Sequence, residues 1–463
     1  MPPGLNATYL PSLRAEIRSW FGETDGLARS MSNGTWMLVE RVLGMSMAVL
    51  VSVWVARYLG PERFGTLNYA LAFVAFFTPI ASLGINNILV KELILDRARE
   101  GLLLGSALVA RFIGTAVATV LCVLAVGLTK GSDDQIFWAV VALTVASAFN
   151  ALDVAGLWLQ SKQVVRGLMY WRMGVTLVFA GARVVAILSD AGIFAFVWIA
   201  AAEVLATDLT NLCAYLAYGS RPQRWKSDGA TMLALVRKSW PLILSAVAAS
   251  IYLKIDQVML AEMVSVASSG VYAVAARISE VWYFVPQVLA TAVFPSLLNT
   301  KLVSAEQYER RMRICLGVFS VAATALAVVI TFSADFIIDT LFGAQYHEAA
   351  DILRIHIWAG VFIFLRAIAS KWLIAEDLYI FSLVSHGVGA VLNIVLNLFM
   401  IPLWGGMGAA VATVIAYAGA SYLFTFCSRR TWPMGRMMTE AILWPLFLPL
   451  ALWRGRASKE RGR

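Results

Sequence analysis

Stretches of eighteen or more mostly apolar residues recur along almost the whole chain. Each is long enough to cross roughly 30 Å of hydrocarbon as a helix that satisfies its own backbone hydrogen bonds. With 60% hydrophobic and 14% charged residues among 463, this pattern excludes an ordinary soluble globule and predicts an all-α integral membrane protein. We count about 12 transmembrane helices, at 36–57, 65–89, 102–128, 136–159, 168–188, 192–217, 240–262, 270–298, 313–334, 353–374, 380–401 and 405–427.

The basic residues lie mainly in alternate loops between these spans. The amino end, 91–101, 160–167, 218–238, 299–312, 371–377 and the tail after 427 hold about 26 lysines and arginines, whereas the opposite loops hold about four. Because lysine and arginine mark the cytoplasmic side, both termini are predicted to be cytoplasmic. The net charge of +9 is therefore explained by topology and does not indicate a nucleic-acid partner.

The spans divide into six and six at the basic loop 219–239. Gly65 and Ala70 recur as Gly270 and Ala275 at a shift of 205 residues, which indicates an internal repeat. We therefore predict two six-helix lobes of the same orientation. The expected organisation is a cytoplasmic segment (1–35), a first lobe (36–218), a linker (219–239), a second lobe (240–427) and a basic cytoplasmic or interfacial tail (428–463).

The first hairpin has a distinctive sequence. Gly60 is suited to a left-handed cap, Pro61 to the start of the next helix, and Gly65 to close helix packing. The surrounding strings, VARYLGPERFGTLNYALAFV and PIASLGINNILVKEL, resemble the amino-terminal signature of the polysaccharide and lipid-linked oligosaccharide (O-antigen type) flippases of the MOP exporter superfamily. In the second half, SIYLKIDQVMLAEM and SGVYAVAARISEVWYFVP resemble the seventh and eighth helices of the same family.

The resemblance implies a two-lobed transporter of the bacterial inner membrane, and not an enzyme. Its substrate would be an undecaprenyl-pyrophosphate-linked oligosaccharide, such as an O-antigen, capsule or exopolysaccharide repeat unit. This lipid would pass from the cytoplasmic to the periplasmic leaflet by alternating access. The implied partners are this lipid-linked oligosaccharide, the lipid bilayer, and a polysaccharide polymerase and glycosyltransferases of the same pathway.

Cationic side chains within the spans are candidates for binding the pyrophosphate. A charge at a helix centre costs roughly 2.5–3.5 kcal/mol on insertion scales, so such residues by default face a bundle interior or an aqueous cavity. Guanidinium groups can replace the hydration of a pyrophosphate with charge-assisted hydrogen bonds. The alternative is that they snorkel or form structural ion pairs. Arg111 and Arg366 are set aside as close to span ends, which leaves Arg41, Arg183, Lys254 and Arg277.

Acidic residues within the spans are candidates for ion coupling. Asp256 lies in the matched string YLKIDQVML, where a buried carboxylate could bind a proton or a sodium ion. A structural ion pair is the alternative. Glu203 and Asp208 in the sixth span rank lower because they do not share a helix face closely. The three histidines, His347, His356 and His386, lack ligand spacing, so neither a metal nor a cofactor is expected.

Three other functions remain open at the level of sequence. A multidrug exporter of the same superfamily would favour an acidic, aromatic cavity, and the cationic bias argues against it. A membrane-embedded glycosyltransferase or polymerase would be expected to carry a sizeable outer loop, which the spacing of the spans does not leave room for. A scaffold would need no buried charge.

Overall fold

The computed structural model describes residues 27–131, 134–162, 165–218 and 225–460. Its fifteen described α-helices are α2 (Leu27–Ser82), α3 (Asn86–Leu95), α4 (Glu100–Thr129), α5 (Gln135–Ser147), α6 (Val154–Ser161), α7 (Val165–Leu188), α8 (Ile193–Tyr218), α9 (Gly229–Met263), α10 (Val266–Glu280), α11 (Phe284–Val303), α12 (Ala305–Leu341), α13 (Ala349–His356), α14 (Ala359–Ala375), α15 (Tyr379–Ser421) and α16 (Trp432–Glu460). Short 3₁₀ segments lie at Arg97–Arg99, Ala148–Asp153, Ala344–Tyr346 and Leu423–Cys427.

Two of these helices each contain a reversal of the chain. In α2 the break is at Gly60, with φ 72° and ψ 172°, and in α15 it is at Gly405, with φ 53° and ψ −129°. Both positions need a positive φ, which glycine adopts at little steric cost. The ψ angle at Gly60 differs from that of the expected left-handed cap, although the hairpin forms where the sequence predicts it. Each broken helix therefore holds two of the predicted spans.

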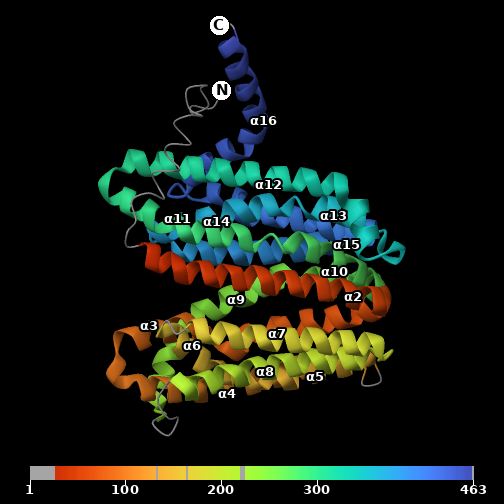
Figure 1. The fold of residues 1–463 in the computed structure, drawn as a ribbon. Helices are drawn as coiled ribbons and strands as arrows, with labels where there is room; N and C mark the ends of the chain where they lie inside the picture. Colours follow the sequence, from red (N-terminus) through yellow and green to blue (C-terminus); the bar gives the residue numbers. More distant parts are fainter. Residues whose placement is uncertain (1–26, 132–133, 163–164, 219–224, 461–463) are drawn as a thin grey trace.

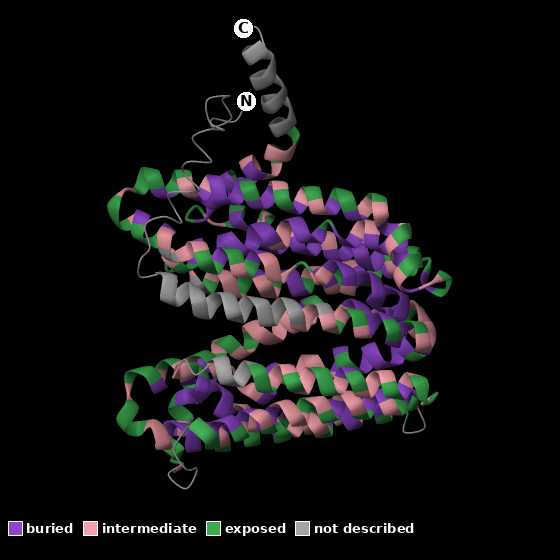
Figure 2. Cartoon of the chain, in the orientation of Figure 1, coloured by how far each residue is buried: buried purple, intermediate pink, exposed green. Residues whose placement is uncertain are grey.

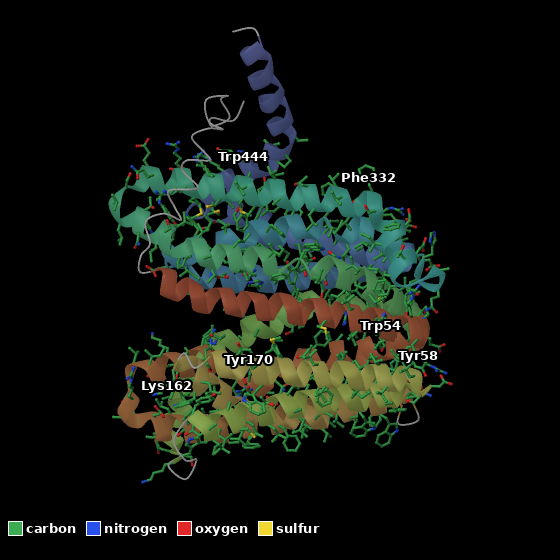
Figure 3. The ribbon with its side chains drawn as sticks, in the orientation of Figure 1. Trp54, Tyr58, Lys162, Tyr170, Phe332 and Trp444 are labelled. Atoms are coloured by element: carbon green, nitrogen blue, oxygen red, sulfur yellow. The ribbon has the colours of Figure 1, made fainter. Side chains whose placement is uncertain are left out.

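The described residues contain nine helices long and apolar enough to cross a membrane, or ten if the bent pair Val266–Phe294 and Ser296–Val303 counts as one span. Because α2 and α15 each count once here, this number is lower than the predicted twelve, and the number of crossings remains a prediction. Large apolar side chains cover the outside of the bundle: Tyr170 is 65% exposed and Phe332 86% exposed (Figure 3). Such a surface suits hydrocarbon and not water.

The helices form two layers (Figure 1). One contains α3 to α8, the other contains α10 to α16, and α2 and α9 lie between them. We call the end where the basic loops lie the basic end, and the end with the turns at Gly60, Gly343 and Gly405 the glycine-turn end. The tail helix α16 packs along α12, where Glu440 accepts hydrogen bonds of 2.7 and 2.9 Å from Arg313.

The apolar core is shared between the lobes at one end and divided at the other (Figure 2). The largest cluster joins α2, α5 and α8 to α10, α12 and α13, through residues such as Tyr69, Phe196, Tyr272 and Tyr346. At the basic end the clusters are separate: one includes Leu104 and Trp158 of the first lobe, and the other lies within the second lobe. The lobes are therefore joined at the glycine-turn end.

The glycines of the internal repeat meet across this junction. A Cβ atom added to Gly65 would lie 2.0 Å from the carbonyl oxygen of Val266, and one added to Gly270 would lie 2.0 Å from the carbonyl oxygen of Pro61. Val266 corresponds to Pro61 at the same shift of 205 residues. The contact is therefore reciprocal, as expected for two halves related by a pseudo-two-fold axis.

Helix α9 belongs to both lobes. Near its start, Ser239 Oγ donates to the carbonyl oxygen of Leu83 at 2.7 Å, and Lys238 pairs with Glu92 at 2.7 Å, both in the first lobe. Its later part packs on α15 and α10 of the second lobe. Pro241, inside the helix, lies just after the first-lobe attachments, where the missing backbone donor weakens the helix.

Candidate substrate and cation sites

A buried polar cluster surrounds Asp256 in the second lobe. Its carboxylate, in a residue only 3% exposed, accepts hydrogen bonds from Tyr272 Oη at 2.8 Å and Asn397 Nδ2 at 2.5 Å, and lies 2.6 Å from Thr413 Oγ1. Asn397 also donates to Asn393 Oδ1 at 3.2 Å, one helical turn away. The reversal at Gly405 brings Asn397 and Thr413, on opposite arms of α15, to the same carboxylate.

The oxygen atoms of this cluster are suited to a small cation. Thr413 Oγ1 lies 2.9 Å from the carbonyl oxygen of Ala409 as well as close to Asp256. The buried Asn397 Oδ1 has no hydrogen-bond partner among the described residues, and neither does Asn393 Nδ2. Carboxylate, amide, hydroxyl and carbonyl oxygens are the donors that hard cations prefer. No basic side chain pairs with Asp256 among the described residues, so the structural ion pair considered from the sequence is not what the structure contains.

Three of the predicted substrate-binding cations lie where α10 meets the first lobe. Lys254 Nζ on α9 lies 2.9 Å from Glu280 Oε2 on α10, and Arg183 Nη2 on α7 lies 2.5 Å from Glu203 Oε2 on α8. Arg277 on α10 lies close enough to Glu280 and Arg183 to interact electrostatically with both. Among the described residues, the Arg277 guanidinium makes no hydrogen bond or ion pair.

The remaining predicted residues do not join this group. The side chain of Arg41, in α2, lies outside the described part of the structure. Glu203, predicted as an ion-coupling residue, is the partner of Arg183. Asp208 lies in a separate first-lobe network with Asp153, Arg111 and Arg172 near it.

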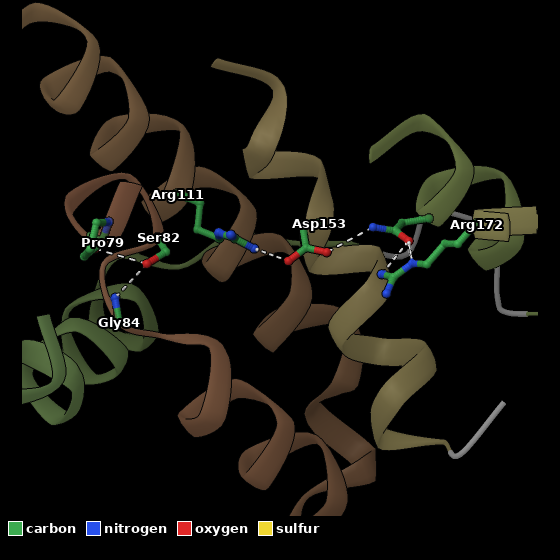
Figure 4. A network of polar contacts seen from close by, with 7 residues as sticks. Pro79, Ser82, Gly84, Arg111, Asp153 and Arg172 are labelled. Carbon is green, nitrogen blue, oxygen red and sulfur yellow. Dashed lines mark hydrogen bonds and ion pairs between the residues drawn. The ribbon is translucent and has the colours of Figure 1, made fainter. Parts of the chain in front are cut away.

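That network joins four helical segments of the first lobe (Figure 4). Asp153 accepts a hydrogen bond from Asn211 Nδ2 at 3.0 Å and lies 3.5 Å from Arg111 Nη1. Asn211 Oδ1 in turn accepts from Arg172 Nη2 at 2.8 Å. Arg111 is only 4% exposed, so it does not snorkel to the membrane surface. The network holds together the 3₁₀ segment that interrupts the fourth predicted span.

Arg366 has a structural role in the second lobe. Its guanidinium is buried and donates to Ser385 Oγ at 2.8 Å, Ser382 Oγ at 3.1 Å and the carbonyl oxygen of Ala420 at 3.3 Å. These acceptors come from both arms of α15, so Arg366 connects α14 to that hairpin.

A polar contact crosses between the lobes at the glycine-turn end. Glu262, at the end of α9, accepts a hydrogen bond from Tyr69 Oη at 2.7 Å, and Lys130 Nζ lies 3.0 Å from the same carboxylate. Lys130 also lies 5.6 Å from the centre of the Tyr69 ring. We call Tyr69, Lys130 and Glu262 the outer latch.

Sequence reasoning missed the residues that complete these sites. Asn393 and Asn397 could have been noticed as two amides four residues apart in an apolar span, a spacing that places both on one helix face. Thr413 and Tyr272 carry no such signal, because hydroxyl groups are common in membrane helices and often bond to the preceding turn.

The solved structures with similar folds are membrane transporters. The lipid II flippase MurJ in an inward closed conformation has a TM-score of 0.67 at 13% identity, covering 92% of this chain and 96% of that chain. A multidrug resistance MATE family transporter of the MOP superfamily in an inward-facing conformation has a TM-score of 0.63 at 14% identity, covering 90% of this chain and 96% of that chain. The eukaryotic MATE transporter AtDTX14 has a TM-score of 0.57 at 12% identity, covering 90% of this chain and 100% of that chain.

Sequence comparison identifies the family independently of these folds. A search of curated proteins finds no match to the chain. The model of the polysaccharide biosynthesis protein family matches residues 30–301, which is more than half of the chain and includes both strings of the first hairpin and those of the seventh and eighth spans. The apolar helices and these similar folds therefore show a multi-pass membrane protein with the fold of MurJ and the MATE transporters, and the chain belongs to the polysaccharide biosynthesis protein family.

Proposed function

We propose that the protein flips an undecaprenyl-pyrophosphate-linked oligosaccharide from the cytoplasmic to the periplasmic leaflet of the bacterial inner membrane by alternating access. The observation that carries this proposal is the Arg277 guanidinium, which makes no hydrogen bond or ion pair among the described residues and lies near Arg183 at the junction of the lobes. An unpaired guanidinium within a membrane span is costly unless it meets water or an anionic ligand. Membership of a polysaccharide biosynthesis family supports a lipid-linked sugar as that ligand.

The arrangement of the lobes supports entry from the basic end. The shared core and the outer latch close the glycine-turn end, while the cores at the basic end are separate. With the basic end on the cytoplasmic side, the pyrophosphate headgroup enters between the lobes there and binds Arg277. The polyprenyl tail stays in the surrounding lipid, and the lobes then rock to open the opposite end.

A cation bound at Asp256 supplies the coupling in this proposal. The carboxylate and the adjacent amide, hydroxyl and carbonyl oxygens hold a sodium ion between α9 and the two arms of α15. Because α9 is attached to both lobes, ion binding at Asp256 acts on a helix that must adjust whenever the lobes move.

The test measures which leaflet holds the lipid-linked oligosaccharide in cells depleted of the protein. A membrane-impermeant probe should find it on the cytoplasmic leaflet, and intact protein should restore its transfer. A charge-assisted hydrogen bond contributes about 1.5–3 kcal/mol, so Arg277→Gln should slow the transfer by at least about tenfold. Arg354→Gln is the matched control, because Arg354 pairs with Asp335 and Asp351 away from this junction.

The same experiment separates the alternatives. A normal lipid pool after depletion, with increased sensitivity to cationic drugs, would instead support a multidrug exporter, the function named for one of the similar structures. A block in polymer elongation with normal transfer between leaflets would support a partner role beside a polymerase.

A further inference from the structure

Helix α10 carries an acid and a base one turn apart beside the first lobe. Arg277 makes no hydrogen bond or ion pair among the described residues, whereas Glu280 is bound to Lys254 of the neighbouring α9 at 2.9 Å. The side chains of Lys254 and Glu280 are only 31% and 26% exposed. The three charges sum to a single positive charge within this partly buried group.

A pyrophosphate that binds Arg277 brings at least two negative charges close to Glu280, because Glu280 lies within electrostatic reach of Arg277. Two cations would then face three negative charges in surroundings of low dielectric constant, where unpaired charge is costly. Lys254 cannot balance the ligand while it remains bound to Glu280. The charge imbalance is removed if one of the two anionic groups takes up a proton.

The other titratable groups around Glu280 do not supply a positive charge. Tyr272 lies on the same helix, Tyr283 follows it, Tyr417 comes from α15 and the buried His356 from α13. Tyrosine hydroxyls are neutral near pH 7, and burial favours the uncharged form of a histidine. Lys254 and Arg277 are thus the two cations that act on Glu280 among these neighbours.

We propose that Glu280 is an internal anion that the substrate displaces, and that it takes up one proton when the pyrophosphate binds. This inference rests on the proposed function. The Glu280 carboxylate leaves the Lys254 ammonium, takes up a proton that the buffered solution supplies at the basic end and becomes a neutral carboxylic acid. The pyrophosphate oxygens then bind Lys254 and Arg277 together. On release of the substrate, Glu280 loses the proton and pairs with Lys254 again.

The binding experiment uses farnesyl pyrophosphate as a probe and the full chain in lipid nanodiscs. Titration calorimetry at pH 8 in two buffers of different ionisation enthalpy gives the number of protons taken up per ligand. The wild-type protein should take up about one proton more than Glu280→Gln, because a glutamine cannot be ionised. Glu280→Gln should bind the probe at least as tightly as the wild type, since Lys254 is then free.

Glu92→Gln is the matched control. Glu92 also pairs with a lysine, Lys238, at 2.7 Å, but that pair lies at the basic end with the lysine side chain 58% exposed. It should take up the same number of protons as the wild type. Equal proton numbers for wild type and Glu280→Gln, with both binding the probe, would overturn the role of Glu280 and leave the proposed function standing. No binding by the wild type would overturn both.

A second measurement needs no variant and so does not depend on folding of Glu280→Gln. Uptake of one proton makes the affinity of the wild type fall by up to about tenfold per pH unit where free Glu280 is ionised. Binding of the fully ionised probe should therefore weaken between pH 8 and pH 9. An affinity that does not change over this interval would contradict the proposal.

Discussion

The cluster around Asp256 contains one acidic side chain and several neutral oxygen donors. Such a set can bind one singly charged cation, because the single carboxylate balances its charge and no second buried charge is needed. Asn397 Oδ1, buried with no hydrogen-bond partner in the described part of the chain, is the atom whose desolvation a bound ion would offset. The buried acidic residues of the two lobes therefore have different neighbours: Asp256 is surrounded by neutral oxygen atoms, whereas Asp153 and Asp208 of the first lobe have arginines near them.

Asp256→Asn should remove stabilisation of the purified protein by sodium. A ligand present at one hundred times its dissociation constant stabilises the folded state by about 2.7 kcal/mol. We expect the melting temperature of the wild type to rise when sodium chloride replaces choline chloride, and that of Asp256→Asn to stay constant. Asp208→Asn, at a buried acid of the first lobe, should keep the sodium response. A response that survives in Asp256→Asn would place the ion elsewhere.

His347 gives a second prediction at the residue scale. It lies in the turn before α13, where its ring nitrogen is 3.0 Å from Asp339 Oδ1, and this hydrogen bond raises its pKa above 6.5. The contact therefore stabilises the turn fully at pH values below 6.5, and this contribution is lost as the pH rises through the raised pKa. An NMR titration of the histidine ring should show the raised value, and Asp339→Asn should return it toward 6.5. An unchanged value in that variant would show that Asp339 is not the cause.

Much of the residue chemistry was visible in the sequence, but its grouping was not. Asp256, Arg277 and Lys254 stand out because charge within an apolar span is rare. Their partners depend on how distant helices pack: Thr413 reaches Asp256 only because α15 folds back at Gly405. Closeness to a span end also gave no sign that Arg111 is buried, whereas in the structure it is 4% exposed and lies 3.5 Å from Asp153 of the 3₁₀ segment.

Among the elements, the first hairpin and α10 pack with their backbones in close contact. Gly65 and Gly270 bring the two backbones together, and neither position leaves space for a methyl group because the nearest atoms belong to the opposite backbone. The sequence repeat predicted the equivalence of these glycines. The repeat did not show whether the two glycines contact each other or only contact equivalent neighbours within separate lobes. Only the structure shows that they contact each other.

Gly65→Ala should weaken the junction of the lobes. The added Cβ atom would overlap the carbonyl oxygen of Val266, and overpacking of this kind typically costs about 1–3 kcal/mol. We expect a lower melting temperature and reduced transfer of the lipid substrate. Gly181→Ala is the control, because Gly181 lies in the helix α7 with nothing within 4 Å of the added atom, so alanine there should be neutral or stabilising. Equal stability of both variants would show that the junction can separate without cost.

For the whole molecule, the structure corresponds to a state closed at the glycine-turn end. Tyr69 and Lys130 belong to the first lobe and Glu262 to the end of α9, so the outer latch must part if the lobes rock as proposed. The contacts within a lobe, such as Tyr58 with Asp190 at 2.8 Å, need not change. The motion can therefore be tested with crosslinks, because a crosslink across the outer latch should block it and a crosslink within one lobe should not.

A crosslink between Lys130→Cys and Glu262→Cys should stop transport. A short thiol-reactive linker is added after the exposed Cys213 and Cys427 have been replaced by serine. Transfer of the lipid substrate should fall to the background rate and recover when the linker is reduced. The control pair, Asp339→Cys with His347→Cys, replaces two second-lobe residues whose Oδ1 and Nδ1 atoms lie 3.0 Å apart, and its crosslinking should leave transport intact. Full activity of the crosslinked latch would rule out rocking about this junction.

The reciprocal glycine contact lies at one end of long helices, and this gives the molecule the geometry of a lever. A helix of 37 residues such as α12 is about 55 Å long, since each residue adds about 1.5 Å. A rotation of about 10° about a contact at one end then moves the other end by about 10 Å, close to the full diameter of a helix with its side chains. A small tilt, with little repacking inside either lobe, is therefore enough to open or close a passage as wide as a helix at the basic end.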